Sequence, residues 1–394
     1  MREVCILGVG QLPVERHSTA SVREMGAASV RAALADAGME GRDGAEGPGA
    51  LYVGNMMSGM LSSQQQLGAL IAHEAGLGGI EAATAEAACG SGAAALRWGY
   101  MAVASGAHEV VMVCGVERMT HVKGGEVTQA LATASDWCDE GGQGETFVSL
   151  NAQLMRLYMD RHDVEASSFG PFAINAHNNS CGNPHALFHK TVTEETYEDA
   201  RIIEEPVRLF DVSPICDGSA AVMLGTPEAL RSLRGPSAPR VHLAASSVGT
   251  DSVGLKGRRD PLGLDAARRS AEQAYAQANL GPDDMDLFEL HDAYTVMAAL
   301  SLEAAGFAEP GEGYQLGLQG DILPDGRIPI TTMGGLKGRG HPVGATGVYQ
   351  LVEAYSQLCG NAGVNQIASP THAMTQNFGG TAATVITHIL TRAA

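Results

Sequence analysis

AEAACGSGAAAL, residues 85–96, sets a cysteine at the point where an alanine-rich helix begins. The alanines after Cys89 predict a buried helix, and Gly90 and Gly92 allow close approach of the backbone to a neighbour or a substrate. A thiol at a helix N-terminus faces unpaired amides and the positive end of the helix dipole, which lowers its pKa. Free cysteine is also among the most buried residue types. On these residues alone, Cys89 is either a nucleophile or a packed core thiol.

The segments around Cys89 alternate between strand and helix patterns. Short apolar runs bounded by glycine predict strands, and apolar residues at helical spacing predict helices, the first with a Ser21 cap and a Gly38 stop. Apolar strands of this kind imply a parallel or mixed sheet covered by helices on both faces. The predicted strands are 2–10, 49–56 and 109–117, and the predicted helices are 21–38, 62–77 and 92–107.

The same order of elements returns after residue 240, which we interpret as an internal duplication. A strand (240–251), a helix (267–286), a strand (287–294), a small-residue helix (343–360) and two closing strands (371–380, 381–390) follow one another. Between the halves lies a polar, His- and Asn-rich segment with one clear helix, 149–162, typical of an inserted lobe that carries ligand contacts. The predicted organisation is 1–118 (first half), 119–209 (inserted loop domain), 210–239 (return of the first half) and 240–394 (second half).

Composition excludes several classes of function. Apolar residues make up 45% of the 394 residues, enough for a large core. Lys and Arg total 25 against 44 Asp and Glu, a net charge of −19, which argues against non-specific binding to nucleic acid or to an anionic membrane. No apolar run is long enough for a transmembrane helix or a signal peptide. The seven cysteines are scattered without a CxxC pair, so we expect a reduced, cytoplasmic setting.

Three further motifs carry chemistry. In GGLKGRGHPVGATG (334–347), His341 stands between Gly340 and Pro342 on a stiff loop, where a neutral imidazole could take the proton of a thiol. In ELHDAY (289–294), His291 and Asp292 follow a strand, at the edge where open α/β sheets bind ligands. In NFGG (377–380), backbone N–H groups could bind an oxyanion. Each motif also has a plain structural interpretation, as a loop histidine, a strand-end pair or a tight turn.

A fourth pattern does not lead to a site prediction. His177, Cys181, His185 and His189 recur every four residues, the spacing of metal ligands on one face of a helix. Gly182 and Pro184 interrupt any such helix. We therefore predict no metal site.

Taken together, the motifs resemble the thiolase family over essentially the whole chain. AACGSGAAAL, CGVERM, RLFDVSPICDGSAAVML, HDAY and GGLKGRGHPVGATG occur in the family's order, and the His-Asp pair is most similar to the sterol-carrier-protein and archaeal branch. The resemblance implies an α/β fold of five layers, α-β-α-β-α, built from two mirrored five-strand halves. It also implies a loop domain, about 119–209, that holds coenzyme A as a substrate, with no permanently bound cofactor and a homodimer or homotetramer.

The resemblance also implies a two-step acyl transfer. His341 takes the proton of Cys89, and the thiolate attacks a thioester or a 3-ketoacyl-CoA to form an acyl-enzyme. One oxyanion hole would consist of the amides of Cys89 and Gly379, and the other of the side chains of His291 and His341. In synthesis the enolate of acetyl-CoA then attacks the acyl group, and in degradation the coenzyme A thiol does so.

The sequence departs from the family at the second acid/base cysteine. The two positions where thiolases carry it are Asn377 and Ala293 in this chain. Proton transfer at the α-carbon of a thioester needs a group close by. Tyr294 and His372 are the nearby candidates, although a phenol with a pKa near 10 is a poor base at neutral pH.

Three hypotheses follow. The chain is an active thiolase in which His291, His341 or water fills the missing role; or it acylates Cys89 and acts as an acyltransferase or lyase, with a small partner subunit; or it is a non-catalytic scaffold. A cysteine hydrolase also needs Cys and His, but the extended match disfavours it. Thiolysis of 3-ketoacyl-CoA and acetylation of Cys89 separate these hypotheses.

Overall fold

A computed structural model describes residues 1–41 and 47–393 of the chain. The first half forms five strands in the order β3-β2-β4-β7-β1. β2 is parallel to both β3 and β4, and β7 runs antiparallel to β4 and β1. The strands span Cys5–Gln11 (β1), Ala50–Gly54 (β2), Glu81–Ala85 (β3), Val110–Glu117 (β4) and Gly218–Gly225 (β7).

The second half repeats this topology. Its strands follow in the order β8-β11-β10-β9, with β9 parallel to β10 and β11 antiparallel to β10 and β8. Among the described residues it has four strands rather than the expected five, because the fifth position holds only a bridge between Phe288 and Ile330. The strands span Val241–Thr250 (β8), Leu287–Glu289 (β9), His372–Gly379 (β10) and Thr384–Arg392 (β11).

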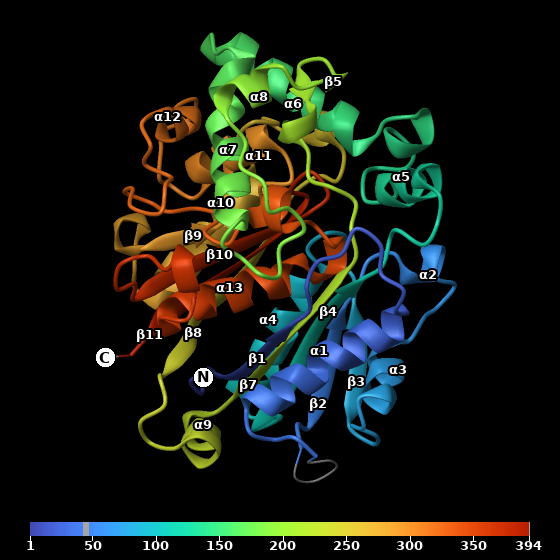
Figure 1. The fold of residues 1–394 in the computed structure, drawn as a ribbon, viewed down its shortest axis with the longest axis vertical. Helices are drawn as coiled ribbons and strands as arrows, with labels where there is room; N and C mark the ends of the chain where they lie inside the picture. Colours follow the sequence, from blue (N-terminus) through green and yellow to red (C-terminus); the bar gives the residue numbers. More distant parts are fainter. Residues whose placement is uncertain (42–46, 394) are drawn as a thin grey trace.

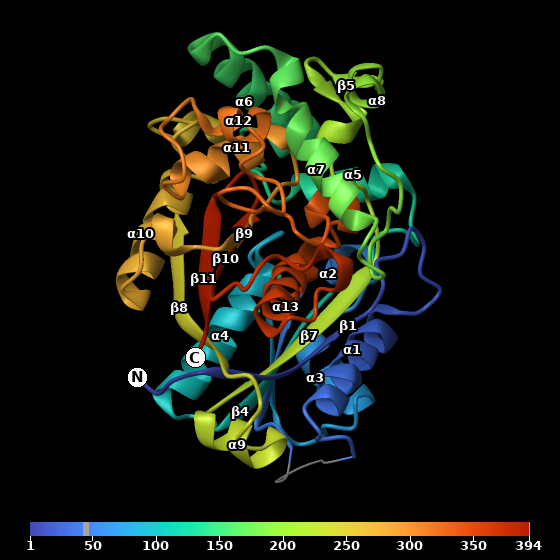
Figure 2. The same ribbon diagram turned by 60° about the vertical axis from the view of Figure 1, so that its left-hand side comes forward.

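The two halves stack as five layers, as the sequence predicts. Figure 2 shows α4 (Ser91–Ser105) and α13 (Thr346–Cys359) side by side between the two halves of the sheet. α1 (Val22–Asp36) and α3 (Leu67–Glu74) cover the outer face of the first half, and α10 (Asp265–Ala278) covers the second (Figure 1). The halves meet where Cys5 of β1 pairs with His242 of β8. The loops before α4 and α13, which carry Cys89 and His341, therefore occupy equivalent places.

The structure contains both the helix start and the helix end that the sequence predicts for α1. The Ser21 side chain accepts from the backbone N–H of Glu24, and the Glu24 carboxylate accepts from the backbone N–H of Ser21, a reciprocal capping box. The helix ends before Gly38, whose φ of +70° suits glycine. Met25, Val30, Ala33 and Leu34 face the sheet.

Much of the segment 119–209 lies at the top of Figure 1, above the sheet, while its part near residues 185–188 reaches down to contact Val14 and residues 338–339. The predicted helix at 149–162 is α6, Phe147–His162. The sequence did not predict α5 (Gly124–Ala132), α7 (Gly170–Ser180) or α8 (Glu194–Glu198). α7 is stabilised by contacts with the second half, since Asn175 donates to the Ile330 carbonyl at 3.1 Å and Asn179 to the Thr331 carbonyl at 3.1 Å. The smaller strands β5 (Ile202–Glu204) and β6 (Val207–Arg208) complete the segment.

The remaining α-helices pack against the two halves and the inserted segment. They are α2 (Ser58–Leu61), α9 (Pro227–Arg234), α11 (Thr295–Ala304) and α12 (Gly313–Leu318). Within the described ranges, no helix has both the length and the apolar character needed to cross a membrane. The domain boundaries at 118, 209 and 239 stay predictions, and Ala394 lies outside the described residues.

Candidate active site

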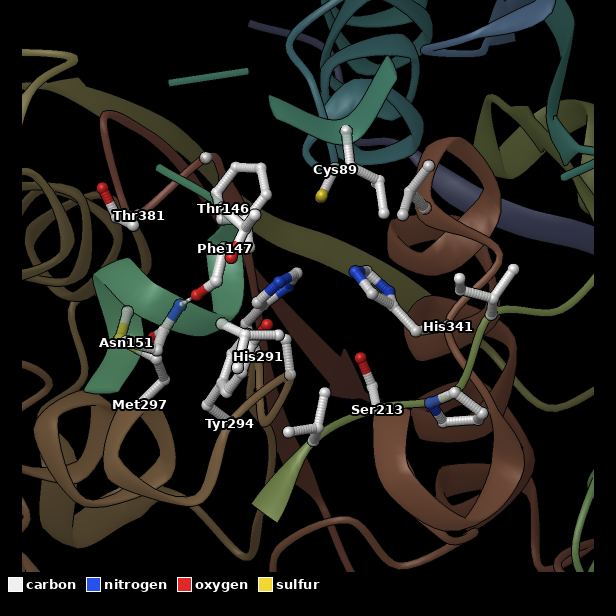
Figure 3. A pocket seen from close by; sticks show the side chains of 18 of the residues that line it. Cys89, Thr146, Phe147, Asn151, Ser213, His291, Tyr294, Met297, His341 and Thr381 are labelled. Carbon is white, nitrogen blue, oxygen red and sulfur yellow. Dashed lines mark hydrogen bonds between the residues drawn. The ribbon is translucent and has the colours of Figure 1, made fainter. Parts of the chain in front are cut away.

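Cys89 stands on a sharp turn between β3 and α4. The residue before it, Ala88, has a φ of +51°, a left-handed conformation that costs an alanine about 1–2 kcal/mol. The buried Ser91 side chain pins the turn, donating to the Ala88 carbonyl at 2.6 Å and accepting from the Ala87 N–H at 2.9 Å. Strain of this kind persists where the surroundings fix it, typically at functional sites. The turn directs the Cys89 sulfur into a cavity (Figure 3).

The turn before α13 packs directly against the turn before α4. A Cβ atom on Gly92 would lie 2.8 Å from the Gly344 carbonyl oxygen, so only glycine permits this approach. Glu117, at the end of β4, ties the same loops together. Its buried carboxylate accepts from the backbone N–H groups of Met56 and Gly344 and from the Asn55 side chain, at 2.9, 3.2 and 3.0 Å. Glu117 lies in the CGVERM motif, but nothing in the sequence marks it as a residue of the site.

His341 follows a π-helical turn, Gly335–Arg339, a distortion often found at functional sites. Its backbone N–H contacts the Cys216 sulfur at 3.1 Å, and its Nδ1 lies 2.7 Å from the Thr346 Oγ1. The Thr346 hydroxyl donates to the Pro342 carbonyl at 3.3 Å, so it accepts from the His341 Nδ1–H. The other nitrogen, Nε2, then carries a lone pair, which suits a proton acceptor.

His291 has the opposite tautomer. Its Nδ1 faces two donors, the Phe378 backbone N–H at 3.3 Å and the Asn377 Nδ2 at 3.0 Å. A nitrogen that accepts from a backbone N–H cannot itself carry a proton, so the proton is on Nε2. The ring is held further by stacking on Phe378, with 5.2 Å between ring centroids. His291 therefore offers an N–H donor.

The two imidazoles face each other at one end of the cavity. Their ring centroids are 5.1 Å apart at an interplanar angle of 85°, and Figure 3 shows both rings near the Cys89 sulfur. The structure thus brings Cys89, His291 and His341 together, one as a thiol, one as a hydrogen-bond donor and one as an acceptor.

The cavity has a volume of about 350 Å³ and mostly apolar walls. The second half supplies Tyr294 and Met297, and α6 supplies Phe147 and Asn151. The segment 212–215 forms a further wall. The cavity-lining residues that the sequence analysis did not name as candidates are Met119, Thr128, Leu131, Thr146, Phe147, Val148, Asn151, Val212, Ser213, Pro214, Ile215, Met297, Val343, Gly380 and Thr381.

Electrostatics set the resting protonation states. Burial, followed by the nearby Glu117 carboxylate, raises the pKa of Cys89 to about 12, against the lowering by its own amide and that of Gly380. The helix N-terminus therefore does not lower this pKa below the ordinary value, contrary to the sequence prediction, because desolvation of the thiolate outweighs it. Burial lowers the pKa of His291 to about 3 and that of His341 well below its ordinary value. At neutral pH the site holds a neutral thiol beside two neutral imidazoles.

This raised pKa has a consequence for alkylation. Reagents such as iodoacetamide attack the thiolate, so modification of Cys89 should still be accelerating with pH at about pH 9. Exposed Cys138 is the internal control and should react faster at neutral pH. Quantitative peptide mass spectrometry across pH 6–10 measures both rates. A plateau for Cys89 at or below about pH 8.5, the free-cysteine value, would contradict the raised pKa.

Other predicted residues lie differently from expectation. Asn377 does not line the cavity and instead holds His291 from behind. Gly379 belongs to β10 outside the cavity wall, whereas the next glycine, Gly380, lines the cavity and its amide acts on the Cys89 sulfur. Gly380 is the second glycine of the NFGG motif, whose backbone N–H groups the sequence marked as candidates for binding an oxyanion.

Two other residues point away from the cavity. Asp292 accepts from the Leu336 N–H at 2.7 Å and pairs with Lys337 at 3.2 Å, which fixes the turn that precedes His341. His372 begins β10, at the end of the strand opposite Gly379, and its Nδ1 contacts Thr391. Because His372 stands at the opposite end of β10 from Gly379 and does not line the cavity, it is not placed to act as the second acid/base group.

The histidines of the His177–His189 region take separate structural places. His177 lies against the rings of Phe188 and Phe210, with centroid distances of 5.4 and 5.3 Å, and His185 contacts the Gln11 side chain. In the part of the chain that the structure describes, no three His, Cys, Asp or Glu side chains are grouped to hold a metal ion.

Comparison with known proteins supplies independent information. Residues 4–228 match the family model described as thiolase, N-terminal domain, and residues 247–392 match thiolase C-terminal domain-like. The chain is 40% identical, over 100% of both chains, to an acetyl-CoA acetyltransferase of Methanothermobacter thermautotrophicus. It is 36% identical, over 99% of both, to an acetyl-CoA acetyltransferase of Methanocaldococcus jannaschii. A solved structure titled Ltp2-ChsH2(DUF35) aldolase has the same fold, with a TM-score of 0.85 at 23% identity over 99% of this chain and 98% of that one.

Proposed function

The chain belongs to the thiolase family, and from this premise we propose that Cys89 carries the acyl group between an acyl-CoA and coenzyme A. It is an enzyme of the thiolase class, and two relatives that it matches over their full length are named acetyl-CoA acetyltransferases. The observation that carries the proposal is the grouping of Cys89, His291 and His341 around one cavity. Acetoacetyl-CoA and longer 3-ketoacyl-CoAs are the proposed substrates. Thiolysis of these compounds by coenzyme A tests the function, and a protein that cleaves none of them would contradict it.

The first step is proton transfer coupled to attack. The Nε2 of His341 takes the Cys89 proton as the sulfur bonds to the ketone carbon of a 3-ketoacyl-CoA. The backbone N–H groups of Cys89 and Gly380 both act on the Cys89 sulfur, and we assign the first oxyanion hole to them. A thiol with a raised pKa and a base with a lowered pKa avoid a resting ion pair in this buried, mostly apolar site.

The second step breaks the carbon–carbon bond. The electron pair moves onto the thioester fragment, which leaves as the enolate of acetyl-CoA, while the acyl group stays on Cys89. The His291 Nε2–H and the newly protonated His341 are the donors that we assign to this enolate oxygen. Coenzyme A then attacks the acyl-Cys89 thioester, the new acyl-CoA forms, and His341 returns to the Cys89 sulfur the proton that it took in the first step.

The enolate carbon also needs a proton, and we assign that role to Tyr294. His291 cannot supply it readily, because two donors occupy its Nδ1 and its Nε2–H binds the oxygen. Tyr294 lines the cavity, and its hydroxyl makes no hydrogen bond with any described residue. Burial raises the pKa of this phenol, so the hydroxyl stays protonated at neutral pH and has a proton to give to the enolate carbon in cleavage. The coenzyme A thiol then returns a proton to Tyr294.

Tyr294→Phe is expected to separate two activities. Thiolysis of acetoacetyl-CoA needs a proton on carbon and should fall about 100-fold. Exchange of labelled coenzyme A into acetyl-CoA passes through acyl-Cys89 without that proton and should fall less than about tenfold. Steady-state thiolysis and isotope exchange on the same preparation measure both. Equal losses in the two assays would show that Tyr294 does not protonate carbon.

We also propose a homodimer or homotetramer, as the family resemblance predicts. β3 lies at one edge of the nine-stranded sheet and pairs with β2 alone among the described strands. Beside it, Trp98 is 43% exposed and contacts Tyr52, whose strand pairs with β3. An unpaired edge next to exposed apolar side chains favours pairing with a second copy. The cytoplasmic setting and the small partner subunit stay predictions.

Light scattering in solution tests the assembly. Trp98→Glu should reduce the particle mass by half or more, because a carboxylate would be buried at the contact. Trp137→Glu is the matched control, since Trp137 is 48% exposed and belongs to the inserted segment rather than to the first half. A wild-type protein of one chain's mass, or an equal response of both variants, would contradict this interface.

A further inference from the structure

The loop that carries His341 is rich in glycine. Three of the seven residues 335–341 are glycine, and Gly340 has a φ of +113°, a conformation that glycine adopts far more readily than other residues. A backbone of this kind has many accessible conformations, so the direction of the His341 ring depends on side chains that anchor the loop. Arg339, directly before Gly340, has a fully buried side chain.

Arg339 anchors this loop through three contacts. Its Nη1 donates to the Gly340 carbonyl at 3.0 Å, in the peptide group that joins Gly340 to His341. Its Nε lies 3.0 Å from the Glu353 Oε1, in an ion pair whose side chains are 0% and 1% exposed. Its guanidinium also lies over the Tyr349 ring, 4.8 Å from the centroid, which is a cation–π contact.

One face of α13 holds both the ring of His341 and the backbone before it. Thr346, Tyr349 and Glu353 stand at positions i, i+3 and i+7, which places them on one stripe of this helix. The Thr346 Oγ1 lies 2.7 Å from the His341 Nδ1, and Glu353 pairs with Arg339 two turns further along. A site that is supported by a helix is held more precisely than one that depends on a loop alone.

Stability alone does not account for the ion pair. Apart from the contact with Arg339, neither oxygen of the Glu353 carboxylate has a hydrogen-bond partner among the described residues. Taking two charges out of water offsets much of their attraction, and apolar side chains of similar volume are often at least as stabilising. Neither residue lines the cavity, so the pair does not contact a substrate there. Its contacts lead instead to the loop that carries His341.

We propose that Arg339 and Glu353 are positioning residues, whose ion pair holds the glycine-rich loop so that the His341 Nε2 faces the Cys89 sulfur. The inference rests on the proposed thiolase function, in which His341 accepts the Cys89 proton. Burial, the His291 ring and then the Arg339 charge lower the pKa of His341, so Arg339 also acts on this ring electrostatically. Without the pair the ring loses its fixed direction, and attack depends on thiolate that forms without the base.

The double variant Arg339→Met/Glu353→Leu tests the proposal. It replaces the pair with apolar side chains of similar volume, so the chain should fold. Acylation of Cys89 by acetyl-CoA, followed by the release of coenzyme A, should be about 10–100-fold slower than in the wild type at neutral pH. The acetyl-CoA concentration that half-saturates acylation should change less than about twofold, because neither residue lines the cavity.

The pH profile separates positioning from stability. With the base in place, a neutral imidazole takes the proton of a neutral thiol, so wild-type acylation should change less than about threefold between about pH 7 and 9. In the double variant the attack depends on the thiolate of Cys89, whose pKa is raised to about 12, so the rate should rise about tenfold per pH unit. The other titratable groups on the elements packed around His341 are the same in both proteins, namely Cys89, Glu117, Cys216, His291, Asp292 and Lys337.

Two results would overturn the proposal. A loss of rate that is equal at every pH would show that the pair only stabilises the fold. A wild-type rate in the double variant would show that His341 does not need the pair. Absence of acylation in the wild-type protein would instead contradict the proposed function, and the positioning role with it.

A second variant and a control complete the experiment. If the double variant does not fold, Arg339→Gln replaces it, because Glu353, whose pKa burial raises to about 8, can then be buried as the neutral acid. The same loss and the same pH profile are expected. Arg240→Met is the control, since it removes an exposed pair with Glu3, with contacts of 2.8 and 2.5 Å, that does not touch the cavity. It should leave both the rate and the pH profile unchanged.

Discussion

Replacing Cys89 with serine is expected to lower kcat for acetoacetyl-CoA thiolysis by about four orders of magnitude or more. A hydroxyl is far less acidic than a thiol, so His341, with its lowered pKa, cannot deprotonate it effectively during attack. The ester that a serine would form is also a poorer acyl donor to coenzyme A than a thioester. Thiolysis of acetoacetyl-CoA at high enzyme concentration, quenched at a series of times, measures the residual rate.

The control for this substitution is Cys138→Ser. Cys138 is an exposed free cysteine outside the cavity, and its replacement should leave kcat within a factor of two of the wild type. A Cys89→Ser enzyme that retains a tenth of the activity would show that another group carries the acyl chain.

His341→Ala is expected to lower the rate of Cys89 acylation by about 10²–10⁴-fold at neutral pH. The loss has a characteristic pH dependence. Cys89 has a pKa raised to about 12, so without the base the reactive thiolate fraction increases with every step in pH. The gap between wild type and variant should therefore narrow as pH rises from 7 to 10. Pre-steady-state acylation by acetyl-CoA, followed by release of coenzyme A, measures it.

His372→Gln is the matched control for His341→Ala. His372 is a half-buried histidine at the far end of β10, and its replacement should change neither the rate nor its pH profile. A His341→Ala variant whose defect is the same at every pH would show that His341 positions a group rather than accepting the thiol proton.

The sequence was sufficient for the fold because its local and global signals agree. The glycine-rich entries before α4 and α13, the cap at Ser21 and the apolar strands all point to a duplicated sheet. α7 was missed because its Asn, His and Gly residues are weak helix formers, and its stability comes from contacts with residues 330–331, which are distant in sequence. The fifth strand of the second half is reduced to the Phe288–Ile330 bridge, and the sequence pattern does not predict this loss.

The residues of the site could be predicted from the sequence, whereas the pKa of Cys89 and the tautomers of the two histidines could not. The motifs bring Cys89, His291 and His341 to one cavity. The direction of the Cys89 pKa was wrong because a helix terminus can be identified from sequence, whereas the depth of burial and the proximity of Glu117 cannot. The tautomers of the two histidines depend on the Phe378 amide and on Thr346, and those contacts exist only in the folded chain.

The most direct measurement of the central claim is the site of acylation. Purified protein is mixed with acetyl-CoA, quenched in acid, digested and mapped by mass spectrometry, with Cys89→Ser treated in parallel. We predict one acetyl group per chain, attached to the peptide that contains Cys89 and removed when coenzyme A is added before the quench. Acetyl-CoA turnover with no acetyl group on Cys89, or a label on another residue that persists in Cys89→Ser, would contradict the account.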